Sequence, residues 1–230
     1  TEVARYGLAY SIGMLVQLFI SGMNSALTPW MYSKIKKGDI CSMRKVLQLL
    51  SVVVVGIAVA LMLISPELVL IFGSPKYREA VYVIPPVAAS VFFIFIYNIL
   101  SMPQFYYEKT QFLMAASMAA AGANVVLNFI FIRLFGYIAA GYTTLACYML
   151  YSVGHYIVSK RILVNEEIQE NLMSPGFLVA CSVFLIGASI ICNLIFPYRI
   201  LRYAILLASA GLVFWKKELL LKTMADIRKK

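Results

Sequence analysis

Charged residues are scarce in this sequence, and the few that are present lie mostly between long apolar stretches. Only 13% of the 230 residues are charged, whereas 62% are hydrophobic, and the mean hydropathy is +0.86. A soluble domain usually carries about 25% charged residues, so this composition excludes an ordinary water-soluble protein. We therefore expect the chain to function within a lipid bilayer.

Acidic side chains are absent from the middle of every apolar stretch. The 10 Asp and Glu residues all lie in connectors or at the ends of the stretches. Membrane pumps commonly carry protons on carboxylates inside the membrane, and the sequence lacks a carboxylate relay of that type. The single histidine is His155, and two interpretations stay open for it: an interfacial residue, or a group that binds a coupling proton.

Motifs for metal binding and for catalysis are also missing. The four cysteines, Cys41, Cys147, Cys181 and Cys192, do not have the spacing of metal ligands or of a disulfide framework. The sequence contains no HExxH, no GxSxG, no P-loop lysine and no glycine-rich dinucleotide turn. We therefore expect a protein that is not an enzyme, with no catalytic residue, no metal site and no bound cofactor.

Seven apolar stretches dominate the chain. Most approach the ~20 residues that a helix needs to cross a ~30 Å hydrocarbon core, and a helix satisfies its own backbone where lipid cannot. We predict an all-α, polytopic transmembrane helix bundle of about seven spans. We expect the second span to end at Pro66, with residues 67–72 lying along the outer membrane surface. The seven stretches are residues 7–31, 46–65, 82–103, 112–131, 138–159, 176–196 and 200–215.

The net charge of +10 could indicate binding to nucleic acid, but the distribution of the charge indicates membrane orientation instead. If the connector 34–45 lies in the cytoplasm and the connectors alternate sides, all but six of the 20 Lys and Arg residues lie inside. This bias follows the positive-inside rule. It predicts an N-terminus outside, a C-terminus in the cytoplasm and no nucleic-acid partner. The six exceptions are Arg5, Lys76, Arg78, Arg133, Arg199 and Arg202.

Polar residues in four of the stretches recur at helical spacing and therefore share a helix face. Gln17, Ser21 and Asn24 form such a row in the first stretch, and Asn124 and Asn128 form another. These side chains either hydrogen-bond between helices as packing contacts or line a wet cavity whose amide and tyrosine groups suit a sugar. Both interpretations stay open. The candidate substrate-binding residues are Gln17, Asn24, Tyr97, Asn98, Gln104, Asn124, Asn128, Tyr148 and His155.

A long polar segment, beginning at Lys160, divides the chain. We expect residues 1–163 to form a five-span unit, residues 164–175 a cytosolic linker, and residues 176–230 two further transmembrane helices with a basic cytosolic tail. Apolar residues in that tail could lie on the inner leaflet. The sequence begins with Thr1 rather than Met and shows no signal peptide, so we expect further sequence upstream.

Three short motifs occur in a distinctive order between residues 4 and 163. They are NSALTPW at 24–30 before a lysine-rich loop and Gly38-Asp39, PE at 66–67 leading to IFGS at 71–74, and NVVLN at 124–128 running to FGYIAAG at 135–141. In this order and spacing they resemble the O-antigen and capsule repeat-unit flippases of bacteria. Those flippases belong to the multidrug/oligosaccharidyl-lipid/polysaccharide exporter superfamily.

The resemblance implies a fold of two six-helix bundles related by a pseudo-two-fold axis, often with two additional helices. This chain is similar to the C-terminal lobe of that MATE-like fold, beginning at the eighth of fourteen helices. The implied activity is transport of a lipid-pyrophosphate-linked oligosaccharide across the bacterial cytoplasmic (inner) membrane by rocking of the halves. Protons or sodium ions are the open choices of coupling ion. The implied partners are the lipid-linked substrate, the bilayer, the N-terminal half of the same protein and the polysaccharide polymerase machinery.

Two alternatives to a glycan flippase stay open. A cation-coupled multidrug exporter of the same superfamily would usually use a membrane-embedded carboxylate, and the apolar stretches contain none. A non-transporting membrane scaffold would recruit assembly enzymes through its basic tail. The grouped polar faces and the three motifs favour the flippase.

Overall fold

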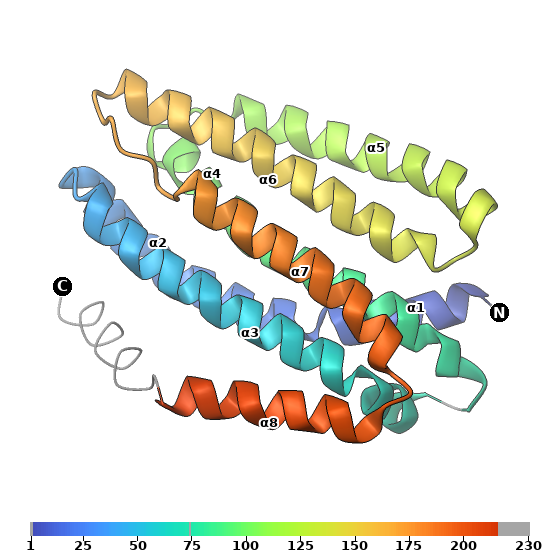
Figure 1. Cartoon of the computed structure of the whole chain (residues 1–230). Coiled ribbons are helices and arrows are strands. Elements are labelled where there is room, and N and C mark those ends of the chain that lie inside the picture. Colours follow the sequence, from blue (N-terminus) through green and yellow to red (C-terminus); the bar gives the residue numbers. More distant parts are fainter. Residues whose placement is uncertain (1, 74, 216–230) are drawn as a thin grey trace.

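The computed structural model describes residues 2–73 and 75–215, and the regular structure of these residues is entirely helical (Figure 1). The predicted all-α fold is confirmed. The basic tail, residues 216–230, lies outside the described residues, so its proposed place on the inner leaflet stays a prediction. The elements are α1 (Glu2–Gly13), α2 (Leu15–Lys36), α3 (Ile40–Phe72), the 3-10 segment η1 (Pro75–Val83), α4 (Ile84–Tyr106), α5 (Gln111–Phe135), α6 (Ala139–Asn165), α7 (Pro175–Ile195) and α8 (Arg199–Trp215).

Five helical segments of the described chain are long and apolar enough to cross a membrane. They are α1 together with α2, then α3, η1 together with α4, α5 and α7. Helix α6, with 27 residues, is longer than α5 and α7, but it carries a row of polar residues. It lies alongside α4 and α5 over its length (Figure 1), so a bilayer that contains those helices contains α6 as well. Whether α8, with 17 residues, also crosses stays a prediction.

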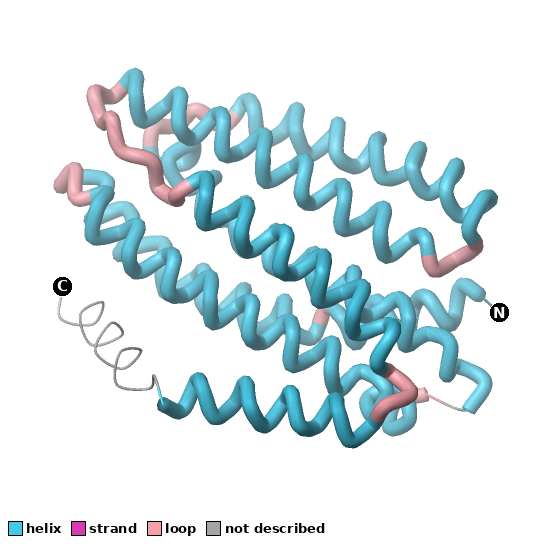
Figure 2. The backbone as a smooth tube through the Cα atoms, viewed as in Figure 1, coloured by secondary structure: helices cyan, strands magenta, loops and turns pink. Residues whose placement is uncertain are grey.

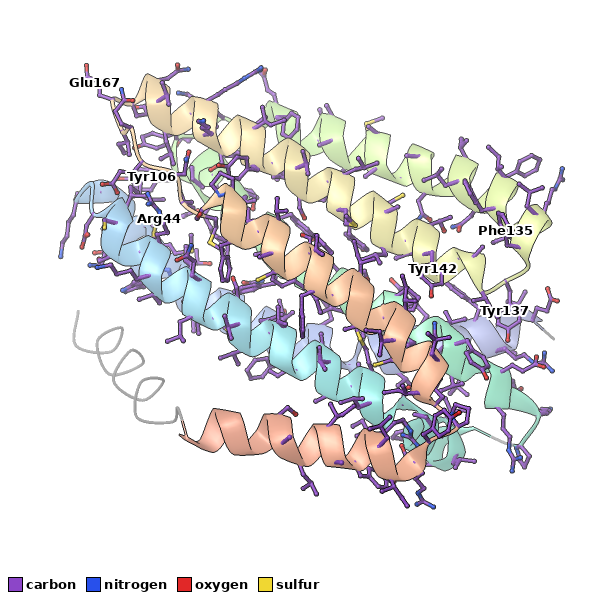
Figure 3. The ribbon with its side chains drawn as sticks, viewed as in Figure 1. Arg44, Tyr106, Phe135, Tyr137, Tyr142 and Glu167 are labelled. Atoms are coloured by element: carbon purple, nitrogen blue, oxygen red, sulfur yellow. The ribbon has the colours of Figure 1, made fainter. Side chains whose placement is uncertain are left out.

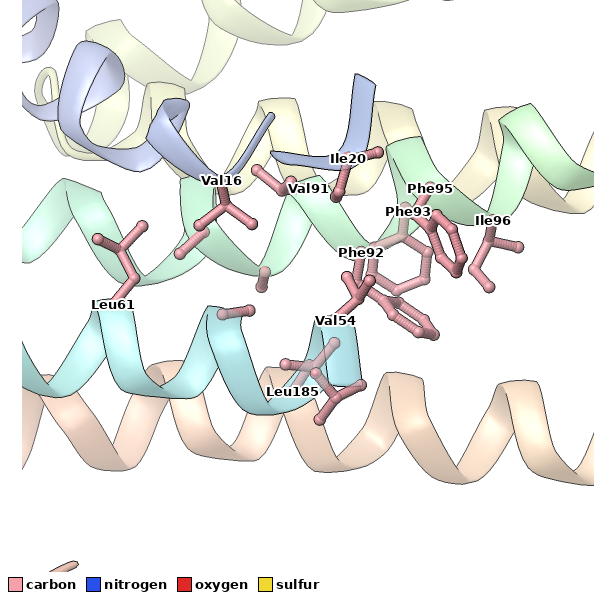
Figure 4. Packing of buried hydrophobic residues seen from close by; sticks show 14 of the residues in the cluster. Val16, Ile20, Val54, Leu61, Val91, Phe92, Phe93, Phe95, Ile96 and Leu185 are labelled. Atoms are coloured by element: carbon pink, nitrogen blue, oxygen red, sulfur yellow. The ribbon is translucent and has the colours of Figure 1, made fainter. Parts of the chain in front are cut away.

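Helix α4 forms the centre of the bundle. Every residue from Ile84 to Ile96 is buried, as expected of a helix that is apolar on all sides. Its phenylalanines, Phe92 among them, pack among residues of α2, α3 and α7, including Val54 and Leu185 (Figure 4). Helices α5 and α6 cover the remaining side (Figure 1). The core therefore fixes one face of α6, and through α6 it positions α5.

The sequence analysis expected a single helix over the first apolar stretch, but the structure has two helices there. The helix is interrupted at Met14, between α1 and α2. Gly13, the last residue of α1, lies so close to α4 that a Cβ atom there would approach Val87 Cγ1 to 2.5 Å. Glycine is needed for this close approach because any side chain would meet the neighbouring helix. The interruption separates the row that includes Gln17 from the residues of α1.

The second correction concerns Pro66, where the sequence analysis expected the span to end. Helix α3 continues through Pro66 to Phe72, so residues 67–72 do not form a separate surface segment. Proline has no N–H for the Met62 carbonyl, and the Ser65 hydroxyl donates to that oxygen instead, at 2.8 Å. Side-chain donors that replace the lost backbone bond explain why a proline is tolerated within a membrane helix.

An arginine from α8 binds the same part of α3. Arg202, which is 3% exposed, donates to the Leu63 carbonyl at 2.6 Å and to both carboxylate oxygens of Glu67 at 2.8 Å. Tyr203 also donates to Glu67, at 2.9 Å. A bidentate arginine–carboxylate pair is among the strongest side-chain contacts. It compensates the charge of Glu67 and holds α8 against α3.

The loops gather at the two ends of the bundle (Figure 2). At one end Arg44, near the start of α3, donates to the Asn171 carbonyl at 2.7 Å, and Lys109 binds Glu166 at 2.8 Å. The connectors α2–α3, α4–α5 and α6–α7 therefore share this end, which Figure 3 marks with Arg44, Tyr106 and Glu167. The alternation assumed for the charge analysis holds. Which end faces the cytoplasm stays a prediction.

Candidate functional site

A cavity of about 570 Å³ lies among α1, α4, α5 and α6. It is large enough to hold part of a drug-sized or saccharide ligand. Its lining, among the described residues, contains hydroxyl, amide and small apolar side chains and no Asp, Glu, Lys, Arg or His. The lining residues are Tyr6, Tyr10, Tyr97, Ser117, Ala120, Ala121, Asn124, Val125, Thr144, Cys147, Tyr148 and Tyr151.

Helix α5 lines one side of this cavity with small and polar side chains. Ser117, Ala121 and Asn124 recur at intervals of four and three residues and therefore lie on one face of the helix. Alanine side chains at this face leave volume that larger residues would fill. The Ser117 hydroxyl lies 2.8 Å from the Tyr151 hydroxyl of α6. No residue of α5 is buried within the described chain, so the face outside the cavity is open to lipid or to another surface.

Tyrosine rings from α4 and α6 form the opposite wall. The Tyr97 ring lies parallel to the Tyr148 ring, with centroids 6.3 Å apart, and meets the Tyr151 ring edge-on at 4.7 Å. Residues 148 and 151 are three positions apart, which places them on one face of α6. Tyrosines offer a flat apolar face and a hydroxyl that can donate or accept. This wall can therefore bind a ring that carries hydroxyl groups.

The amide of Asn124 is held in place from outside the cavity. Asn128 donates to the Asn124 side-chain oxygen at 2.9 Å, and the Thr143 hydroxyl of α6 donates in turn to the Asn128 oxygen. This relay engages the oxygen of Asn124, so its NH₂ group supplies the donors for a ligand. Asn128 is one helical turn from Asn124 and contacts it without lining the cavity itself.

His155 and Gln104 lie next to the tyrosine wall but do not line the cavity. Both are fully buried, and Gln104 Nε2 lies 2.8 Å from His155 Nδ1. The His155 ring contacts the Tyr151 ring edge-on, with centroids 4.5 Å apart, and the Tyr97 ring at 5.8 Å. This pair therefore contacts two side chains that line the cavity.

Three of the candidate residues lie elsewhere. Asn98 donates to the Ile94 carbonyl of its own helix at 2.9 Å, and the Asn24 carbonyl accepts from Thr28 at 2.8 Å. Gln17 is half-buried on α2. None of these three lines the cavity, whereas Tyr97, Asn124 and Tyr148 do.

The candidate residues leave out several side chains that line the cavity, among them Tyr6 and Tyr10 on α1. Their spacing of four residues places both on one face of the helix, and their rings lie 5.8 Å apart. That spacing was visible in the sequence. The interruption at Met14, which separates these tyrosines from the row of Gln17 and Asn24, has no comparable signal in the sequence.

The MatE family model matches residues 1–130 of the chain, which is more than half of its length. The chain belongs to the MatE family. Searches of curated proteins and of solved structures found no match. The MatE family is part of the exporter superfamily that the sequence motifs indicated, and its members are transporters. With its apolar helices, the chain is therefore a multi-pass membrane exporter of that superfamily. The match covers α1 to α4 and most of α5, which together contribute three of the four walls of the cavity.

Proposed function

We propose that this exporter moves a lipid-pyrophosphate-linked oligosaccharide across the bacterial cytoplasmic membrane, with its saccharide in the cavity among α1, α4, α5 and α6. The single observation that carries this proposal is the lining, which combines five tyrosines with asparagine, serine and threonine and has no charged side chain among the described residues. Saccharides are neutral, present many hydroxyl groups, and have flat apolar faces that stack on tyrosine.

Movement of α5, which forms one wall of the cavity, would let the substrate enter and leave. Helix α5 contacts the rest of the described chain through α6, and it has no buried residue. A helix that packs against a single neighbour can move relative to α4 more readily than one enclosed on several sides. Alternating exposure of the cavity to the two sides of the membrane, by rocking of helix groups, would carry the saccharide across. The expected orientation places the N-terminus outside and the C-terminus in the cytoplasm, and the polysaccharide polymerase is the expected recipient.

A second candidate function is export of cationic drugs, which is equally consistent with the family. The Tyr97, Tyr148 and Tyr151 rings could bind an organic cation through cation–π contacts. A cationic substrate would be expected to need a carboxylate as well, and the lining has none among the described residues. The two functions differ in what the same tyrosines must bind, so one set of variants separates them.

The experiment compares Tyr148→Ala with Tyr142→Ala in a strain that lacks the chromosomal gene. Tyr148 lines the cavity, whereas Tyr142 lies on α6 outside it, with its hydroxyl hydrogen-bonded to Asn193 at 3.0 Å. Loss of one sugar–tyrosine contact worth about 1.4 kcal/mol lowers affinity about tenfold. We expect surface polysaccharide to fall about tenfold in Tyr148→Ala, with lipid-linked units accumulating inside, and Tyr142→Ala to behave as the wild type.

Two results would contradict the proposal. One is normal surface polysaccharide in the deletion strain. The other is a deletion strain that becomes sensitive to cationic dyes while its polysaccharide is unchanged, which would favour drug export. If removal of residues 216–230 abolished surface polysaccharide while Tyr148→Ala did not, the result would support the scaffold hypothesis.

A further inference from the structure

A buried polar pair links α4 and α6 beside the tyrosine wall. Gln104 and His155 are each 0% exposed, and they meet at 2.8 Å through Gln104 Nε2 and His155 Nδ1. An amide nitrogen only donates, so Nδ1 accepts and the neutral ring carries its proton on Nε2. Gln104 Oε1 and His155 Nε2 are buried, and each lacks a hydrogen-bond partner within the described chain. Buried polar atoms without partners are rare in folded proteins, so each one calls for an explanation.

Aromatic rings from three helices enclose the imidazole. Tyr97 of α4, Phe112 of α5 and Tyr151 of α6 have centroids 5.8, 5.4 and 4.5 Å from the His155 ring. Phe112 reaches this position because residue 154 is a glycine, where a Cβ atom would lie 3.3 Å from Phe112 Cζ. Aromatic rings at such distances can stabilise a cation. Such contacts can offset part of the desolvation cost that burial imposes on a charged imidazole.

The groups that contact the ring carry no competing charge. From α4 they are Tyr97 and Gln104, from α5 Phe112, and from α6 Tyr151, so the titratable neighbours are phenols. The charged pair that follows the same ends of α4 and α6, Lys109 with Glu166, is closed on itself at 2.8 Å. A proton bound in the enclosure is therefore held by the imidazole and not by a neighbouring carboxylate.

We propose that Gln104 and His155 form a proton-binding site that couples proton movement to occupancy of the tyrosine-lined cavity. One proton from water binds at Nδ1, the Gln104 amide rotates, and Oε1 accepts the new N–H. Release returns the same proton to water and restores the first arrangement. The hydrogen bond from the charged ring to Gln104 Oε1 is charge-assisted, so it is stronger than the bond from Gln104 Nε2 to the neutral ring. Tyr97 and Tyr151 contact both the ring and the cavity, so a ligand that displaces them alters the surroundings of the ring. The coupling of proton binding to transport rests on the proposed function, whereas the proton-binding site itself does not.

The site is tested without transport, by nitrogen-15 NMR of the imidazole in the full-length protein in lipid nanodiscs. The signals of His155 are identified by their loss in His155→Asn. We expect a neutral ring with its proton on Nε2 at pH 8, a doubly protonated form that appears as the pH falls toward 4, and side-chain amide signals of Gln104 that move in the same pH range. A ring that stays in one protonation state from pH 8 to pH 4 would overturn the proposal. An amide that does not respond to ring protonation would overturn it as well.

The coupling is tested in proteoliposomes with a fluorescent undecaprenyl-pyrophosphate-linked oligosaccharide as the probe. We expect a pH gradient to accelerate wild-type transport several-fold. His155→Asn and Gln104→Met should retain exchange without a gradient but lose the acceleration, whereas Ser90→Ala, a buried change on α4 away from the ring, should keep it. Acceleration that persists in His155→Asn would overturn the coupling. Absence of any transport by the wild type would contradict the proposed function instead, and the NMR titration would still decide the site.

Discussion

At the scale of single residues, the turn between α2 and α3 shows how one carboxylate organises a helix end. Asp39 is the N-cap of α3, where it accepts from the Ser42 backbone N–H at 3.3 Å and from the Ser42 hydroxyl at 2.6 Å. The Lys34 ammonium, 5% exposed, binds the same carboxylate at 2.5 Å. A buried lysine needs a partner of this kind. One side chain therefore caps a helix and compensates a buried charge.

The Asp39 carboxylate should make stability depend on pH. Hydrogen bonds from Lys34 and then from Ser42 hold the pKa of the Asp39 carboxyl well below its usual range. A depressed pKa stabilises the folded state above the unfolded value of about 4, and this contribution is lost as the pH falls further. Asn also caps helices well, so Asp39→Asn removes the charge and keeps the cap. We expect the variant to unfold at lower temperature than the wild type at pH 6 to 7, with the difference shrinking below about pH 4. An equal difference at pH 6 and pH 3 would contradict this account.

At the scale of elements, the sequence predicted the helices but not their continuity. Hydropathy reports which residues avoid water, so it located the apolar spans. It does not report where a side chain replaces a missing backbone hydrogen bond. For this reason α3 was expected to stop at Pro66, although the Ser65 hydroxyl supplies the donor that Pro66 lacks. For the same reason the interruption at Met14, which depends on the contact of Gly13 with α4, was not predicted.

The candidate site was predictable to the extent that helical spacing defines a face. Rows on α4, α5 and α6 bring Tyr97, Asn124 and Tyr148 to one cavity, because those helices are regular there; that these residues bind substrate stays a prediction. The row on α2 did not reach the cavity, because spacing does not say which neighbour a face meets. That information comes from packing, and here it depends on close approaches such as Gly141 with α4.

The contact between α4 and α6 should depend on Gly141. A Cβ atom at this position would lie 2.9 Å from Pro86 Cγ and 3.2 Å from the Val83 carbonyl oxygen, both of which are held rigidly. Forcing extra volume into a packed interface costs about 1–3 kcal/mol. We expect Gly141→Ala to lower the unfolding temperature of the purified protein in detergent. The matched control is Gly122→Ala on α5, where a Cβ atom meets nothing within 4 Å. Equal effects of the two variants would contradict the close approach.

At the scale of the whole molecule, the ion pairs at one end of the bundle join three connectors. Arg44 lies near Glu170 at 3.8 Å, and Lys109 binds Glu166 at 2.8 Å. These connectors carry much of the basic charge that predicts a cytoplasmic location. Exposed ion pairs contribute little to stability, so their value here is to identify which loops share a side.

Cys41 tests that orientation, because it is exposed at the basic end, whereas Cys147 and Cys192 are buried. We expect a membrane-impermeant maleimide to label Cys41 in inside-out vesicles and not in intact cells with a permeabilised outer membrane. Tyr198, exposed in the connector between α7 and α8, supplies the matched control. Tyr198→Cys in a Cys41→Ser background should show the opposite result. Labelling of Cys41 from the periplasmic side would reverse the proposed topology.

The cavity among α1, α4, α5 and α6 is most directly tested by site-specific photocrosslinking to a lipid-linked oligosaccharide labelled in its sugars. A benzophenone amino acid replaces Ser117, which lines the cavity, or the adjacent Met118 on the same helix, which does not line it and is 71% exposed. Mild acid then removes the lipid, so only crosslinks to sugar keep the label. The account predicts acid-stable label at position 117 and little at position 118. Equal label at both positions, or label at 118 alone, would contradict it.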